Sequence, residues 1–152
     1  MGAFAVLGPG AEDRAVSELE AAWEAEEAAL QRGDIDAAVN AVVDAWTLPD
    51  ASKALRKRVA AMQRRAFELQ VGESTAVEAP DPAEQRPDGL AQLDVPALAA
   101  VGERDKRDFR EGAEVLARTL PRGSHAVIEG AGHLAPLETP GAFRELVLGF
   151  LR

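Results

Sequence analysis

The sequence predicts an α/β protein built on a parallel sheet, and two observations support this class. Residues 3–7 and 96–101 are short unbroken apolar runs that end at a glycine, which is typical of strands buried on both faces. Residues 124–129 form a third predicted strand, again followed by glycine. Helical segments separate the strands, so right-handed crossovers would place about three parallel strands side by side with flanking helices.

A long helical segment separates the first predicted strand from the second. Residues 11–32 carry apolar side chains at helical spacing among many glutamates. Gly33 is typical of a helix end, and Asp34 is typical of the cap of the following helix. We expect a third helix to begin at a cap formed by Asp50 and to continue to about Leu69.

The second half of the chain contains a linker and two further helices. Residues 71–90 hold several prolines among acidic residues, which indicates a loop or linker ending in a short helical turn around Leu90. Residues 108–119 have the apolar periodicity of a helix. Thr139 is the expected cap of a last helix, because a proline follows it at the first helical position.

Composition excludes several classes of function. The formal net charge is −9, which argues against a nucleic-acid partner and against an anionic membrane surface. The chain has no cysteine, so disulfides, thiolate metal sites and a cysteine nucleophile are excluded. Two histidines without cysteine give no metal constellation, and no cofactor motif is complete. No apolar run approaches the roughly 20 residues of a membrane span, so we expect a cytoplasmic protein without a metal or cofactor.

Four short motifs in the last sixty residues are recognisable when they are taken together. They are Val95-Pro96-Ala97-Leu98, Gly102-Glu103-Arg104-Asp105, Gly130-Ala131-Gly132-His133 and Leu137-Glu138-Thr139-Pro140. Together they resemble the closing section of α/β-hydrolases, including the spacing between the aspartate and the histidine. Upstream, residues 19–70 are similar to the helical cap of many such hydrolases, and residues 2–10 are similar to the strand before that cap.

The resemblance implies a truncated α/β-hydrolase fold with an inserted helical cap. Residues 1–10 and 91–152 would form the truncated core, with about three parallel strands and flanking helices. Residues 11–90 would form the cap or lid insertion together with its linker.

The resemblance also assigns two residues to a catalytic triad, Asp105 and His133. Histidine can take a proton from a nucleophile near neutral pH, and a carboxylate on its other ring nitrogen fixes the tautomer. We expect the two side chains to lie close together, even if neither takes part in chemistry. Trp23 and Trp46 either line a ligand pocket under the cap or act as core anchors. His125 is interpreted as an ordinary strand residue.

The nucleophile of the family has no counterpart in this sequence. In the family it lies in a Gly-x-Ser-x-Gly elbow before the cap, and no such motif is present. The serines are Ser17, Ser52, Ser74 and Ser124. The loop that supplies the oxyanion hole precedes the elbow, so it has no counterpart either. The chain is therefore expected to lack serine-hydrolase activity and to bind a small molecule or a protein under its cap.

Two other functions remain open at this point. In the first, His133 and Asp105 act on a bound water molecule, which would make the chain a weak hydrolase or general-base enzyme. In the second, the chain is a fragment of a full-length α/β-hydrolase whose nucleophile is encoded upstream of Met1.

The missing half of the sheet suggests a partner. In the intact fold, the strand at residues 3–7 lies beside the strand that leads to the nucleophile. Without that neighbour, the side chains of Phe4, Val6 and Leu7 would lie on an open apolar edge. We expect a second copy to pair with this edge about a two-fold axis, giving a homodimer.

Overall fold

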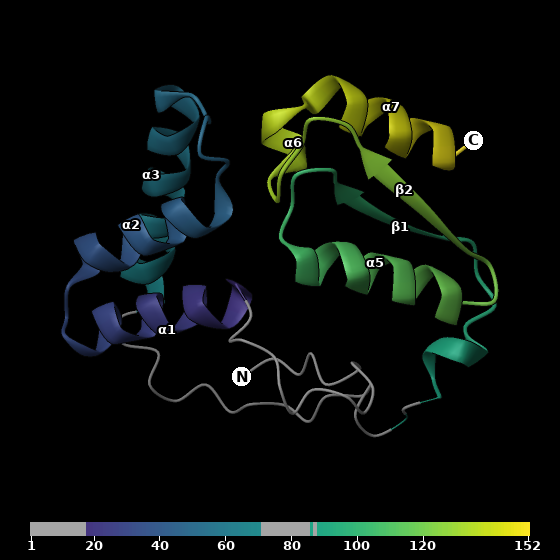
Figure 1. Cartoon of the computed structure of the whole chain (residues 1–152), viewed down its shortest axis with the longest axis horizontal. Helices are drawn as coiled ribbons and strands as arrows, with labels where there is room; N and C mark the ends of the chain where they lie inside the picture. The colour runs from purple at the N-terminus through teal and green to yellow at the C-terminus, as the bar shows by residue number, and fades with distance from the viewer. Residues whose placement is uncertain (1–17, 71–85, 87) are drawn as a thin grey trace.

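The computed structural model describes residues 18–70, 86 and 88–152 of the chain, and this part is a mixed α/β structure (Figure 1). It contains six α-helices and a parallel sheet of two strands. The predicted strand at residues 3–7 lies outside the described residues, and so do Phe4, Val6 and Leu7 with the expected dimer edge. Most of the predicted linker, residues 71–85, also lies outside them.

Three helices form one side of the molecule, which we call the helical lobe (Figure 1). They are α1 (Glu18–Gln31), α2 (Ile35–Trp46) and α3 (Lys53–Gln70). Their positions confirm the three helices that the periodicity of the sequence predicts. In the described part of the chain, no helix combines the length and the hydropathy that crossing a bilayer requires.

The boundary between α1 and α2 follows the sequence closely. Gly33 has a φ of +70°, a conformation that glycine adopts without strain. The N–H groups of Gly33 and Asp34 donate to the carbonyls of Leu30 and Ala29 at 2.9 and 3.0 Å, which is the Schellman pattern of a helix end. The carboxylate of Asp34 then accepts the N–H of Ala37 at 2.9 Å, so the predicted cap is confirmed.

The predicted cap of the third helix is wrong. α3 begins at Lys53, and the Ser52 hydroxyl accepts the N–H of Leu55 at 3.1 Å. Asp50 stands too early in the chain for this role, because a cap must directly precede the first helical residue. Its carboxylate instead binds the guanidinium of Arg104.

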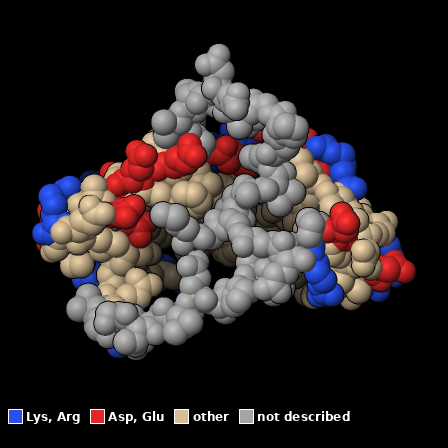
Figure 2. All heavy atoms as spheres, turned by 90° about the horizontal axis from the view of Figure 1, so that it is seen from below, with Lys and Arg blue, Asp and Glu red and all other residues tan. Residues whose placement is uncertain are grey.

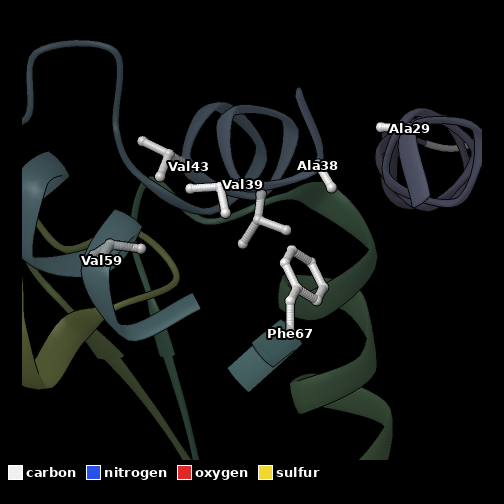
Figure 3. Close-up of a cluster of buried hydrophobic side chains, with 7 residues drawn as sticks. Ala29, Ala38, Val39, Val43, Val59 and Phe67 are labelled. Atoms are coloured by element: carbon white, nitrogen blue, oxygen red, sulfur yellow. The ribbon is translucent and has the colours of Figure 1, made fainter. Parts of the chain in front are cut away.

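The core of the helical lobe is a cluster of small apolar side chains around one aromatic ring. Phe67 points from α3 toward Val39 of α2, and only 3% of its surface is exposed (Figure 3). Each buried valine or phenylalanine contributes about 1.5–3 kcal/mol relative to an exposed position. The buried members of the cluster are Ala29, Ala38, Val39, Val42, Val43, Val59 and Phe67.

Charged side chains cover the outside of the helical lobe. Glu24 and Glu27 of α1 are exposed. Acidic side chains gather on part of the face seen in Figure 2. The basic helix α3 takes its carboxylate partners from α2, because Arg56 binds Asp44 and Arg64 binds Asp36. The close packing of α3 is therefore with α2.

The other side of the molecule, which we call the α/β lobe, contains the sheet. Strands β1 (Ala97–Gly102) and β2 (Gly123–Ile128) pair in parallel, with Ala97 opposite Gly123 and Gly102 opposite Ile128. They confirm the second and third predicted strands to within one residue at each end. A 3₁₀ turn, η1 (Leu90–Gln92), precedes β1 where a helical turn is expected.

Helices cover both faces of this short sheet (Figure 1). Helix α5 (Arg107–Thr119) connects the strands and packs on one face, while α6 (Ala135–Glu138) and α7 (Pro140–Phe150) lie on the other. Thr139 is the N-cap residue of α7 and Pro140 is its first residue, which confirms the predicted position of the cap. The Thr139 hydroxyl makes no capping hydrogen bond and instead donates to the Ala135 carbonyl at 3.4 Å. The one-turn helix α6 has no counterpart in the sequence prediction.

Candidate active site

The candidate site lies where the loops after β1 and β2 meet at the carboxyl end of the sheet. The backbone N–H of Arg104 donates to the carbonyl of Ala131 at 2.8 Å, which ties one loop to the other. Gly102 lies against the carbonyl of Gly132, and a Cβ atom on Gly102 would lie 2.2 Å from that oxygen. Only glycine at residue 102 allows the two loops to approach each other this closely.

Asp105 and His133 face each other from these two loops. His133 Nδ1 lies 3.2 Å from both carboxylate oxygens of Asp105. The Asp105 side chain is only 6% exposed, and its Oδ1 also accepts the N–H of Lys106 at 2.7 Å. The expected proximity of the two side chains is confirmed. Because the carboxylate accepts a hydrogen bond from Nδ1, a neutral His133 would carry its proton there and leave Nε2 as an acceptor.

Two aromatic rings enclose the imidazole of His133. The ring centroid of Trp46, at the end of α2, lies 4.6 Å from that of His133, and the centroid of Phe109 lies 4.4 Å from it. The Trp46 and Phe109 centroids are 5.9 Å apart, so the three rings form a triangle of tilted contacts. Lys106 Nζ lies 5.9 Å from the centroid of Trp46, within cation–π range.

Of the two tryptophans singled out in the sequence, Trp46 contacts the His133 ring. Trp23 lies on α1 with 42% of its surface exposed, and it is not one of the three rings. His125 is an exposed residue of β2 opposite Ala99 in the sheet register, consistent with an ordinary strand residue. Sequence reasoning missed Phe109, although its position four residues after the strand-end Asp105 places it in the first turn of α5.

Further contacts join the two lobes around His133. Leu48 packs against Gly132, where an added Cβ would lie 2.8 Å from a Leu48 methyl carbon. Within the α/β lobe, the Glu138 carboxylate accepts the N–H of Gly132, the residue before His133, at 2.7 Å. The guanidinium of Arg104 donates two hydrogen bonds to Asp50, at 2.9 and 3.1 Å, and these bonds hold the pKa of Asp50 below its usual range.

The described hydroxyl groups are all engaged away from His133. Ser124 donates to the Ala97 carbonyl at the opposite end of the sheet, and Thr47 donates to the Val43 carbonyl. The other three, those of Ser52, Thr119 and Thr139, have partners in or beside their own helices. Ser17 and Ser74 lie outside the described residues. Within the described ranges, therefore, no hydroxyl is placed to pass a proton to Nε2.

The chemistry available at the site is that of an oriented base. Nε2 can accept a proton from water or from a hydroxyl group, and Asp105 can stabilise the resulting imidazolium. Across the part of the chain that the structure describes, no three acidic or histidine side chains come close enough to hold a metal ion.

Comparison with solved structures finds this mixed α/β fold in an esterase and in a phospholipase A. An esterase from Thermogutta terrifontis, solved with malate bound, superposes with a TM-score of 0.60 over 94% of this chain and 53% of its own, at 22% identity. A membrane phospholipase A, described as a bacterial virulence factor, superposes with a TM-score of 0.53 over 93% of this chain and 46% of its own, also at 22% identity.

The comparisons establish the fold and no more. The chain spans about half the length of both solved structures. No protein-family profile matches the sequence, and no curated protein sequence is significantly similar to it.

The orientation of His133 can be tested by replacing Asp105 with asparagine. In the unchanged protein, we expect the neutral imidazole to carry its proton on Nδ1, because the carboxylate accepts from that atom. An asparagine amide can donate as well as accept, so Asp105→Asn should shift the population toward the Nε2–H tautomer. Long-range ¹H–¹⁵N NMR spectra of the ring nitrogens measure this population.

The matched control is Asp94→Asn, which removes an exposed carboxylate before β1. It should leave the His133 tautomer unchanged. A tautomer that is the same in the Asp105→Asn variant as in the unchanged protein would contradict the assigned role of Asp105.

Proposed function

We propose that this chain is a hydrolase homologue that binds a small ester or carboxylate beside His133 without turning it over through an acyl-serine intermediate. The observation that carries this proposal is that Asp105 and His133 form an intact pair, whereas the hydroxyl groups of the described residues are bonded to other partners. The absence of a Gly-x-Ser-x-Gly motif from the sequence points the same way.

The surroundings of His133 favour a small molecule with both an apolar and an anionic part. Trp46 and Phe109 offer aromatic surface next to the imidazole, and Lys106 offers a cation over Trp46. The similar esterase was solved with malate, which is a small carboxylate. The resemblance predicts that the loop of oxyanion-hole donors has no counterpart in this sequence. Because each such donor is worth about 10²–10³ in rate, we expect such a molecule to be bound more readily than cleaved.

Weak hydrolysis by water is a second candidate function, and the geometry of the pair favours it. With Asp105 on Nδ1, His133 Nε2 is free to take a proton from a water molecule that attacks an activated ester. The same pair would serve a nucleophile encoded upstream of Met1, if the chain is a piece of a longer hydrolase. The reading frame upstream of Met1 distinguishes that alternative.

One comparison of variants separates the first two candidates. We expect the unchanged protein and His133→Ala to show equal, near-background turnover of 4-nitrophenyl acetate. Malate or a non-hydrolysable ester analogue should stabilise the unchanged protein, by about 2.7 kcal/mol at one hundred times the dissociation constant. This stabilisation should be lost in His133→Ala, as measured by thermal denaturation.

His125→Ala is the control, because it removes the other histidine from the exposed side of β2. It should behave as the unchanged protein in both assays. Turnover that disappears in His133→Ala and persists in His125→Ala would select the hydrolytic candidate. Stabilisation that is equal in all three proteins would reject binding at His133.

The homodimer expected from the first strand remains a proposal, and so does the division into a truncated core and a cap. Phe4, Val6 and Leu7 lie outside the described residues, so the dimer rests on the apolar sequence of residues 3–7 alone. The cap interpretation is supported by the helical lobe, whose Trp46 reaches the imidazole of His133.

A further inference from the structure

One exposed ion pair joins the two lobes immediately beside the His133 site. Asp50 lies between α2 and α3, and Arg104 lies in the loop after β1, 54 residues further along the chain. Their two parallel hydrogen bonds, at 2.9 and 3.1 Å, form the forked arrangement that arginine and a carboxylate prefer. The pairing lowers the pKa of Asp50 and raises that of Arg104, so it favours the charged form of each group.

On the helical lobe, the position of Asp50 is closely linked to that of Trp46. Only three residues separate them. Of these, Thr47 is fixed to the end of α2 because its N–H and its hydroxyl both donate to the Val43 carbonyl, at 3.1 and 2.6 Å. Pro49 restricts the backbone directly before Asp50. A carboxylate anchored at Asp50 therefore limits where the Trp46 ring can lie.

On the α/β lobe, Arg104 is part of the loops that carry the histidine and its aspartate. Its backbone N–H donates to Ala131, and Asp105 is the next residue. Its guanidinium is also close enough to Glu138 for that carboxylate to raise its pKa, and Glu138 holds the N–H of Gly132. The loop that carries His133 therefore contacts Arg104 through Ala131, and Glu138 lies near both Arg104 and this loop.

We infer that Asp50 and Arg104 are positioning residues of the His133 site. The pair, which we call the clasp, holds the indole of Trp46 against the imidazole of His133. Its use in ligand binding rests on the function proposed above, but the contact that it maintains does not require a ligand. Without the clasp, Leu48 would still pack on Gly132, so the lobes stay associated while the Trp46 ring loses its fixed position.

Global stability cannot distinguish this role from that of an ordinary surface ion pair, because exposed pairs contribute little to the free energy of unfolding. The informative measurement is the contact itself. In a Trp23→Phe background, Trp46 is the only tryptophan in the chain, so its ring protons can be assigned without overlap. Nuclear Overhauser cross-peaks between the rings of Trp46 and His133 then report their proximity in the full chain without any ligand.

We expect these cross-peaks to be lost in Asp50→Asn and in Arg104→Gln. They should return when the charges are exchanged in the double variant Asp50→Arg, Arg104→Asp. The control is Asp44→Asn, which breaks the exposed ion pair with Arg56 between α2 and α3 and should leave the cross-peaks unchanged. In the unchanged protein, 1 M salt should weaken the cross-peaks, because the screening length falls to about 3 Å.

Cross-peaks that persist in Asp50→Asn and Arg104→Gln would overturn the clasp, as would a charge exchange that fails to restore them. The salt measurement tests the inference without any substitution, and cross-peaks insensitive to salt would contradict it. If the proposed function is wrong but the clasp is right, the cross-peaks will respond as expected and malate will give no stabilisation that depends on His133.

Discussion

Replacing Gly102 with alanine is expected to lower the free energy of unfolding by at least about 2 kcal/mol. A Cβ atom on this residue would lie 2.2 Å from the carbonyl oxygen of Gly132 and 2.5 Å from that of Ala131. Both are backbone atoms and cannot rotate away, so the loop that carries His133 must shift. The midpoint of urea unfolding measures the loss of stability, and NMR of the His133 ring measures the loss of its contact with Asp105.

The matched control for Gly102→Ala is Gly112→Ala. Gly112 lies inside α5, and an added Cβ there meets no atom within 4 Å. Because alanine favours the helix, this change should raise the free energy of unfolding by about 0.5–1 kcal/mol. Equal unfolding midpoints for the two variants would show that the approach of the two loops does not require glycine at residue 102.

Phe67→Ala should lower the free energy of unfolding by about 3–5 kcal/mol, more than Gly102→Ala. The phenyl ring is 3% exposed and fills the space between α3 and α2, facing Val39 (Figure 3). Its removal leaves a cavity in the main cluster of the helical lobe. Trp46 packs against the same cluster, so the variant should also weaken the contact of Trp46 with His133. Urea unfolding followed by circular dichroism measures the first effect.

Leu69→Ala provides the comparison within the same helix. Leu69 is 60% exposed, so its truncation should change the free energy of unfolding by no more than about 0.5 kcal/mol. A cost for Phe67→Ala as small as that for Leu69→Ala would mean that the cluster does not hold α3 to α2.

The elements predicted correctly are those whose signals are local. Gly33 and Asp34 carry the information for a helix end and a helix start within a few residues, and both act as predicted. The two described strands coincide with short apolar or strand-like segments of the sequence that are followed by a glycine. The proximity of Asp105 and His133 follows from the parallel order of these strands, whose carboxyl ends lie at one edge of the sheet.

The features that sequence reasoning missed depend on contacts between distant segments. Asp50 has the composition of a helix cap, but its partner Arg104 is 54 residues away, and only the packing of the lobes brings them together. Phe109 has the spacing of a core residue of α5, yet its ring lies against His133. The helix α6 is only one turn long, too short for periodicity to indicate it.

The Asp105–His133 pair belongs to one uninterrupted strand–helix–strand segment, in which the two residues are only 28 positions apart. A short loop is inexpensive in entropy to close, so this segment can form early in folding, before the tryptophan from the other lobe arrives. Because both residues lie in one continuous segment, the pair does not depend on the sequence of the helical lobe. Genetic exchange of residues 18–70 would replace the aromatic wall that Trp46 provides beside His133 and would leave the acid and base as they are.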